Sequence, residues 1–170
     1  MAAETSSVPA TGPAEAAPAD KQALRLWLRL LDCSGLVEKI VRTRLAETFD
    51  TTLPRFDVLA ALERAPQGLQ LGELSRWLKV SNGNVTGIVT RLTAEGLIDR
   101  TVDPNDGRVF RVSLTAAGRE AFLAMAAAHE AWINTLFEGL GAAEQGELLT
   151  LLTRLQRSVA ERAAEPGSEA

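Results

Sequence analysis

Residues 71–97 read LGELSRWLKVSNGNVTGIVTRLTAEGL. Apolar residues at helical spacing predict a two-turn helix from Leu71 to Leu78 and a second helix that runs to Glu95. Gly96 then stands where a left-handed C-terminal cap is expected. The connection between the two helices is three residues long, and its last residue, Ser81, is a good N-cap. Two helices of this size joined by so short a turn are typical of a helix-turn-helix.

The second of these helices has two different faces. One face is an apolar arc that is expected to point to the core, and it consists of Val85, Ile88, Val89 and Leu92. The opposite face carries two glycines, each of which costs a helix about 1 kcal/mol relative to alanine. Their joint placement on the outward face favours a backbone that approaches a partner closely. The alternative is a glycine-weakened helix in a domain that does not bind DNA.

The side chains around these glycines suit DNA. An asparagine pairs with adenine through two hydrogen bonds, a threonine contacts the methyl group of thymine, and an arginine suits a phosphate. We therefore expect this helix to read bases in the major groove. The candidate DNA-binding residues on it are Ser81, Asn82, Gly83, Asn84, Thr86, Gly87, Thr90 and Arg91.

A hairpin is predicted immediately after the recognition helix. The β-rich runs Leu97–Val102 and Val109–Leu114 are separated by Asp103–Gly107, which consists of turn-forming residues. We expect Asp106 to brace Arg108, which then enters a narrow minor groove, because such grooves attract arginine. The alternative is an ordinary polar turn whose surface ion pair contributes little.

Long helices are predicted on both sides of this unit. Helical spacing runs from Lys21 to Phe49, with a bend expected at Ser34-Gly35, and a short helix follows Pro54. After the hairpin, Thr115 caps a helix to about Phe137, and a last helix covers about residues 142–160.

The order of these elements predicts a mainly α (α+β) protein, a winged helix-turn-helix with long N- and C-terminal helices. Apolar stripes along these helices exceed what one small domain can cover, which indicates a homodimer. The expected segments are a disordered arm (1–20), an N-terminal dimerisation helix (21–50), a winged DNA-binding domain (51–115), C-terminal dimerisation helices (116–162) and a disordered tail (163–170).

The composition narrows the function classes. The chain has 170 residues, 46% of them hydrophobic and 24% charged, with a net charge of −4. Its longest uncharged run, Val80–Thr90, has eleven residues, whereas a membrane helix needs about 20. One cysteine and one histidine exclude an internal disulfide and make a metal site or a catalytic triad improbable. Without a phosphate loop or a secretory signal, we expect a cytoplasmic protein that is not an enzyme and has no metal or cofactor.

The ordered set of motifs resembles the MarR family of transcriptional regulators. The resemblance covers about residues 24–160, and the matching strings are FDVL (56–59), LGEL (71–74), SNGNVT (81–86), RL (91–92), EGL (95–97), DPNDGR (103–108) and LTAAG (114–118). It implies an obligate homodimer on a pseudo-palindromic operator. It also implies a repressor that is released by a small phenolic or aromatic acid, which sits between the dimerisation helices and the winged domain. Gly107 departs from the second arginine that the family often has there, which removes one expected wing contact.

Two strings point to a branch of this family. TLPRFD (52–57) and SNGNVTG (81–87) are similar to regulators of plant aromatic acid degradation, some of which respond to hydroxycinnamoyl-CoA thioesters. An effector of this kind needs an apolar pocket with cations. The candidates are the apolar residues Trp27, Leu31, Phe49 and Phe56 and the arginines Arg25, Arg29, Arg42, Arg44 and Arg55. The alternative is that the aromatic residues are core and the arginines are solvated.

Two other functions compete with this interpretation. Some regulators of the family sense peroxide through a cysteine on the first helix, where Cys33 lies. Those sensors hold the thiolate with tyrosines, and this chain has none; we expect Cys33 to be a buried structural residue. His129 is expected to be packed or on the surface. A winged helix can also serve as a protein-binding adaptor, which a gel shift with DNA distinguishes from a regulator.

Overall fold

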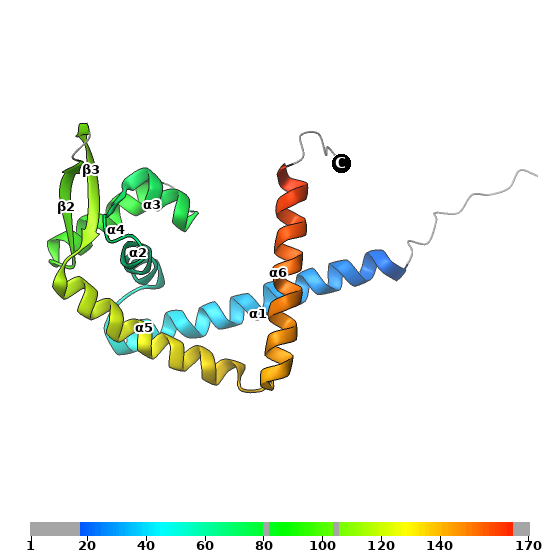
Figure 1. The fold of residues 1–170 in the computed structure, drawn as a ribbon. Helices are drawn as coiled ribbons and strands as arrows, with labels where there is room; N and C mark the ends of the chain where they lie inside the picture. Colours follow the sequence, from blue (N-terminus) through cyan, green and yellow to red (C-terminus); the bar gives the residue numbers. More distant parts are fainter. Residues whose placement is uncertain (1–17, 80–81, 104–105, 165–170) are drawn as a thin grey trace, which may run out of the picture. The chain divides into compact units, whose positions relative to one another are not determined.

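A computed structural model describes residues 18–79, 82–103 and 106–164, and for residues 18–20, 82, 103 and 106–108 it describes the backbone alone. The fold is mostly helical with one small sheet, which confirms the expected class (Figure 1). Its elements are α1 (Pro18–Phe49), α2 (Leu53–Glu63), β1 (Leu69–Gln70), α3 (Leu71–Leu78), α4 (Asn82–Ala94), β2 (Ile98–Asp103), β3 (Asp106–Leu114), α5 (Ala116–Phe137) and α6 (Ala142–Ala164).

The predicted helix-turn-helix is formed by α3 and α4. The Glu73 carboxylate accepts a hydrogen bond from the backbone N–H of Gln70 (2.8 Å), which caps the start of α3. Lys79 ends α3 in the left-handed conformation, with φ 54°. The shared core is apolar, because Leu74 of α3 and Val85, Val89 and Leu92 of α4 are all buried. Burial of these side chains fixes the angle between the two helices and holds α4 against the rest of the winged domain.

The sheet has three antiparallel strands in the order β1-β3-β2. β2 and β3 form the expected hairpin, with Ile98 opposite Leu114 and Val102 opposite Phe110. The hairpin is longer than predicted: residues 103 and 106–108, expected in the turn or beside it, have strand backbone. Turn-forming residues predict that the chain changes direction. They do not predict how many residues on each side of the turn are still paired as strands. β1 was not predicted at all, because two residues are too short to show alternation.

Two glycines join α4 to the hairpin and to α5. Gly96 has φ 73°, so it provides the predicted left-handed cap. A Cβ atom on Gly118 would lie 1.8 Å from the backbone oxygen of Leu97, so only glycine fits there. Thr115 caps α5 as expected: its hydroxyl accepts from the N–H of Gly118 (2.9 Å) and donates to the carbonyl of Gly96 (2.7 Å). The start of α5 is thereby fastened to the loop that follows α4.

The terminal helices extend beyond the predicted limits. α1 begins at Pro18, inside the segment expected to be disordered, and α6 continues to Ala164, past the predicted end near residue 160 and into the expected tail. Alanine-rich ends with few large apolar residues suggested disorder, but alanine also has the highest helix propensity. α1 has no interruption at Ser34-Gly35, where the Ser34 hydroxyl donates to the Leu31 carbonyl (3.1 Å).

The chain divides into two compact units, Met1–Ile40 and Val41–Ala170. The predicted boundary at residue 50 is ten residues further along. Val41 and Leu45, in the last turns of α1, are buried and belong to the second unit. Within the described residues, no helix combines the length and the apolar character that crossing a membrane requires.

Candidate nucleic-acid interface

α4 has the two faces that its sequence predicts. Val85, Val89 and Leu92 are buried and Ile88 is half-buried. The opposite side is exposed over two and a half turns, and it consists of Gly83, Asn84, Thr86, Gly87, Thr90 and Arg91. The hydroxyl of Thr90 donates to the carbonyl of Thr86 (2.9 Å). This bond turns the hydroxyl toward the helix backbone and the methyl group of Thr90 away from it. The exposed face therefore offers an amide, a guanidinium and two threonine side chains.

The two glycines on this face are not required by packing inside the protein. A Cβ atom built on Gly83 or Gly87 meets nothing within 4 Å. Gly118 is the contrasting case: a Cβ atom there would clash with backbone atoms, so packing inside the protein requires glycine. The open space at Gly83 and Gly87 lies outside the fold, so these residues leave room for something that approaches the α4 backbone.

An ion pair ties α4 to α2. The guanidinium of Arg55, on α2, pairs with the carboxylate of Glu95, which follows the last turn of α4. The Nε atom of Arg55 is buried and makes no hydrogen bond within the described residues. Arg55 was predicted to meet an anionic ligand; here its Nη2 atom donates to Glu95, 40 residues away in the sequence, and the ligand contact stays a prediction.

A groove that sequence reasoning missed runs between α2 and α4. One hollow of about 320 Å³ is lined by Thr52, Arg55, Gly83, Asn84, Gly87, Ile88 and Arg91. A neighbouring hollow of about 350 Å³ is lined by Thr52, Pro54, Asp57, Leu78, Asn84 and Ile88. Thr52, Asn84 and Ile88 line both, so the two hollows adjoin, and together they are called the groove between α2 and α4. Its lining comes from segments 30 residues apart, and no local pattern indicates it.

The predicted DNA contacts of the turn and the wing tip fall largely outside the described part. Ser81 is not described, and for Asn82, Asp106 and Arg108 the structure gives the backbone alone. The proposed brace between Asp106 and Arg108 therefore lies outside the described side chains. Further down the wing, the Arg100 guanidinium lies 4.8 Å from the centre of the exposed Phe110 ring. The wing thus carries a cation and apolar side chains on one exposed face.

The nine predicted effector residues are divided between the two compact units of the chain. Phe56 is buried against the rings of Phe122 (5.7 Å) and His129 (5.1 Å), so it packs in the core, and its place in an effector pocket stays a prediction. Phe49 lies 6.2 Å from the Trp132 ring, and the Arg44 guanidinium covers that ring at 5.9 Å. Arg42 is exposed. The remaining four residues are exposed on the unit that ends at Ile40: Arg25, Trp27, Arg29 and Leu31.

The one cysteine and the one histidine have different surroundings. Cys33 is exposed on α1, so the expectation of a buried thiol is wrong for this chain by itself. The residues next to it on α1, from Leu31 to Leu36, are also exposed in the single chain. His129 is packed on Phe56, one of the two positions expected for it. Among the described residues, no cluster of histidine, cysteine and carboxylate side chains has the geometry of a metal site.

A helix-turn-helix followed by a hairpin, with an open polar face on the second helix, defines the winged-helix class of DNA-binding proteins. A sequence model of the MarR family matches residues 49–109. The crystal structure of a MarR family transcriptional regulator from Silicibacter pomeroyi is 31% identical, covers 84% of this chain and 99% of that chain, and superposes with a TM-score of 0.72. The chain belongs to the MarR family; it is a transcriptional regulator and not an enzyme.

Two other relatives are similar over shorter parts. Wild-type MarR from E. coli, in its apo form, is 26% identical, with a TM-score of 0.67 over 75% of this chain and 94% of that chain. The transcriptional activatory protein BadR of Rhodopseudomonas palustris is 34% identical over 104 residues, which are 60% of this chain. The chain covers 59% of the length of BadR.

Proposed function

We propose that the protein is a homodimeric repressor that binds a pseudo-palindromic operator and is released by a small aromatic or anionic effector. The observation that carries the proposal is the exposed face of α4, where two glycines with open space above them are flanked by Asn84, Thr86 and Arg91. Such a face allows the helix backbone to lie deep in a major groove while polar side chains reach base edges. As a DNA-binding regulator, the protein acts in the compartment that holds the DNA, which we take to be the cytoplasm.

Each residue of this face has a different part in the proposed binding. Asn84 pairs with a base edge, preferentially adenine, and the threonine methyl groups contact thymine. Arg91 neutralises a phosphate, and Asn82, the first residue of α4, stands where a helix N-terminus binds another phosphate. Ser81, the preceding residue of the sequence, is assigned to the same phosphate. On the wing, Arg108, braced by Asp106, inserts into the adjacent minor groove.

Separate substitutions distinguish base reading from phosphate binding. We expect Asn84→Ala to weaken operator binding by about 1–3 kcal/mol and to leave binding to random DNA almost unchanged. Arg91→Ala is expected to weaken binding to both and to reduce the salt dependence by about one charge. Fluorescence anisotropy over a salt series, with a labelled operator located by footprinting of the upstream region, measures both effects. Asn134→Ala, on the exposed side of α5, is the control. Equal losses on operator and random DNA for Asn84→Ala would contradict its role in base reading.

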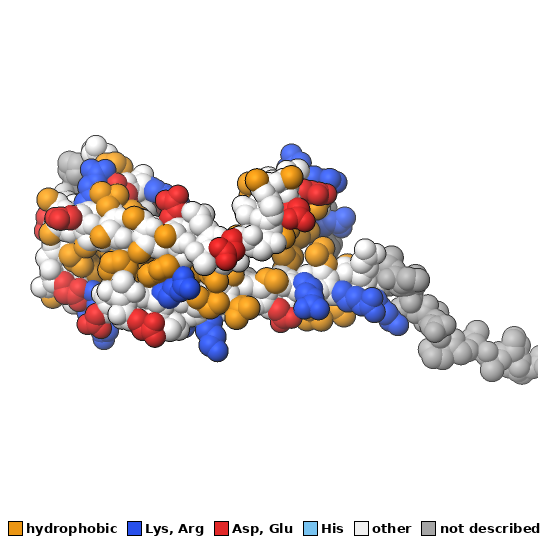
Figure 2. Space-filling model, turned by 90° about the horizontal axis from the view of Figure 1, so that it is seen from below, with side chains coloured by type: hydrophobic (Ala, Val, Ile, Leu, Met, Phe, Trp, Pro, Cys, Tyr) orange, Lys and Arg blue, Asp and Glu red, His pale blue; other side chains and the backbone are white. Residues whose placement is uncertain are grey.

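Exposed apolar side chains support the homodimer. No residue of α6 is buried in the single chain, and its stripe of large apolar side chains is 37–58% exposed: Leu148, Leu151, Leu152, Leu155 and Val159. On α1, Leu24, Trp27, Leu28 and Leu31 are 45–56% exposed. Figure 2 shows hydrophobic side chains at the surface of these terminal helices. Exposed apolar stripes of this length on a helix are typical of a protein interface.

Sedimentation at micromolar concentration is expected to give about twice the chain mass of 18.2 kDa. Leu155→Glu places a charge in the stripe on α6 and is expected to shift the mass toward that of one chain, because a buried unpaired charge is costly. Leu149→Glu is the matched control, since Leu149 lies at the side of the stripe and is 67% exposed. A monomeric parent protein, or equal effects of the two variants, would contradict an interface along this stripe.

The groove between α2 and α4 supports a direct mode of release. Arg91 and Asn84 belong both to the groove and to the face proposed to contact DNA. An aromatic anion in the groove, such as an aromatic acid or the acyl end of its CoA thioester, therefore competes with the operator for the same side chains. A thermal-shift screen of such compounds identifies the effector, because a ligand of the folded state raises the melting temperature. A reporter assay settles the sign of regulation, which for BadR is activation by its name.

A further inference from the structure

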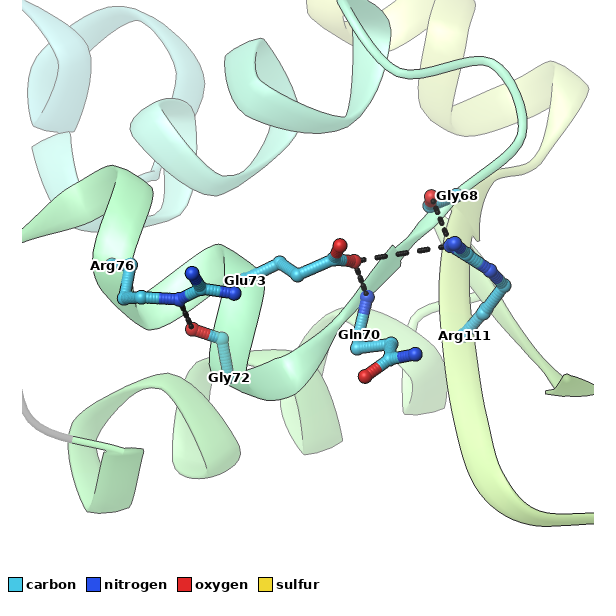
Figure 3. Close-up of polar contacts among 6 residues, drawn as sticks. All are labelled: Gly68, Gln70, Gly72, Glu73, Arg76 and Arg111. Carbon is cyan, nitrogen blue, oxygen red and sulfur yellow. Dashed lines mark hydrogen bonds and ion pairs between the residues drawn. The ribbon is translucent and has the colours of Figure 1, made fainter. Parts of the chain in front are cut away.

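A cluster of polar contacts joins the start of α3 to the middle of the wing (Figure 3). The guanidinium of Arg111, on β3, donates from Nη1 to the carbonyl of Gly68 (3.2 Å). The same nitrogen lies 3.8 Å from the Glu73 carboxylate. That carboxylate also accepts the backbone N–H of Gln70, which caps α3. One arginine of the wing thus contacts both the residue that precedes β1 and the residue that caps the first helix of the helix-turn-helix.

The backbone alone joins these parts only weakly. β1 is two residues long, and it pairs Leu69 with Val112 and Gln70 with Arg111. Gly68 has φ 76°, and a Cβ atom there would lie 2.8 Å from the Val112 carbonyl, so the loop passes close to β3 at this point. A ladder of only two residue pairs holds β1 and β3 at a fixed angle only weakly. The side chain of Arg111 adds contacts with Gly68, before β1, and with Glu73, after it. The Arg111 and Glu73 side chains are 26% and 36% exposed, so the ion pair by itself contributes little to stability.

We propose that Arg111 is a positioning residue that sets the wing at the angle to α4 at which both reach DNA together. This inference rests on the proposed function, in which α4 occupies a major groove and Arg108 an adjacent minor groove. The path from Arg111 to α4 is short, because Glu73 lies in the first turn of α3 and Leu74, next to it, packs in the core with α4. When the Arg111 contacts are broken, the wing moves relative to α4, and α4 and Arg108 no longer reach their grooves at the same time. Operator affinity then falls although Arg111 itself does not touch DNA.

The test is a double-substitution cycle between Arg111 and the wing tip. Arg111→Met keeps the aliphatic stem and removes the donors; we expect about a tenfold loss of operator affinity with little change in melting temperature. In an Arg108→Ala background the same substitution is expected to cause no further loss, because the contact that it positions is already gone. Arg111→Lys keeps the charge and is expected to recover part of the affinity. Hydroxyl-radical footprinting of Arg111→Met is expected to lose protection under the wing and keep it under α4.

The control is an Arg–Glu pair that joins two elements outside the helix-turn-helix. Arg119 on α5 bonds Glu63 on α2 at 2.7 Å, and Arg119→Met is expected to leave operator affinity unchanged. Full affinity in Arg111→Met overturns the inference, and so does an undiminished loss in the Arg108→Ala background, which means a separate contact of Arg111 with DNA. If Arg108→Ala itself costs no affinity, the proposed wing contact fails and this inference fails with it. A loss in Arg108→Ala beside full affinity in Arg111→Met refutes the positioning role alone.

Discussion

Gly87→Ala is expected to make the protein more stable and less able to bind its operator. Alanine in place of a mid-helix glycine stabilises a helix by about 1 kcal/mol, and the added methyl group meets nothing within 4 Å inside the protein. In the proposed complex that space is filled by DNA, so the methyl group holds the whole helix away from the groove. Because several base contacts of about 1–3 kcal/mol each depend on that approach, we expect operator affinity to fall by about 100-fold or more.

The two quantities are measured on the same samples, by urea denaturation at fixed protein concentration and by anisotropy with labelled operator. Gly83→Ala, on the same face, is expected to act in the same direction on binding. Its matched control is Gly72→Ala: both glycines are the second residue of their helix, both are exposed, and both have open space at the Cβ position. Gly72→Ala is expected to leave operator affinity nearly unchanged. A Gly87→Ala variant that binds operator as tightly as the parent would refute the close approach of α4 to DNA.

Gly118→Ala is expected to have the largest effect on stability of any conservative substitution considered. The new Cβ atom would lie 1.8 Å from the carbonyl oxygen and 2.7 Å from the carbonyl carbon of Leu97. Both are backbone atoms, and the segment is held by the bond from the Thr115 N–H to the same Leu97 oxygen (3.1 Å), so the clash cannot be relieved by a side-chain rotation. Overpacking usually costs about 1–3 kcal/mol, and a clash with fixed backbone is expected to reach or exceed the upper end of that range.

Two further glycines calibrate this measurement by urea denaturation. Gly139→Ala meets open space and is expected to be nearly neutral. Gly96→Ala also meets nothing within 4 Å, but its φ of 73° imposes a left-handed conformation that costs a residue other than glycine about 1–2 kcal/mol. The expected order of destabilisation is therefore Gly118, Gly96, Gly139. A Gly118→Ala protein as stable as Gly139→Ala would mean that α5 does not dock on Leu97 as described.

Local features of the fold were predictable from the sequence because they depend on neighbours in the chain. The spacing of Val85, Val89 and Leu92 gave the buried side of α4, and Gly96 and Thr115 marked the helix ends that the structure shows. Helical periodicity and capping depend on residues within about four positions of one another, so the order of residue types is enough to predict them. The family strings belong to the same category, since each is short and continuous.

The contacts between distant segments were decided by the tertiary structure alone. Arg55 pairs with Glu95 across 40 residues, and Arg111 bonds Gly68 across 43. The sequence showed Arg55 only as a cation next to apolar residues, a pattern equally suited to a ligand, a phosphate or a carboxylate. Which partner an arginine meets depends on how α2 and β3 pack against the helix-turn-helix. That packing follows from burial of the shared core, which places side chains together regardless of their separation in the chain.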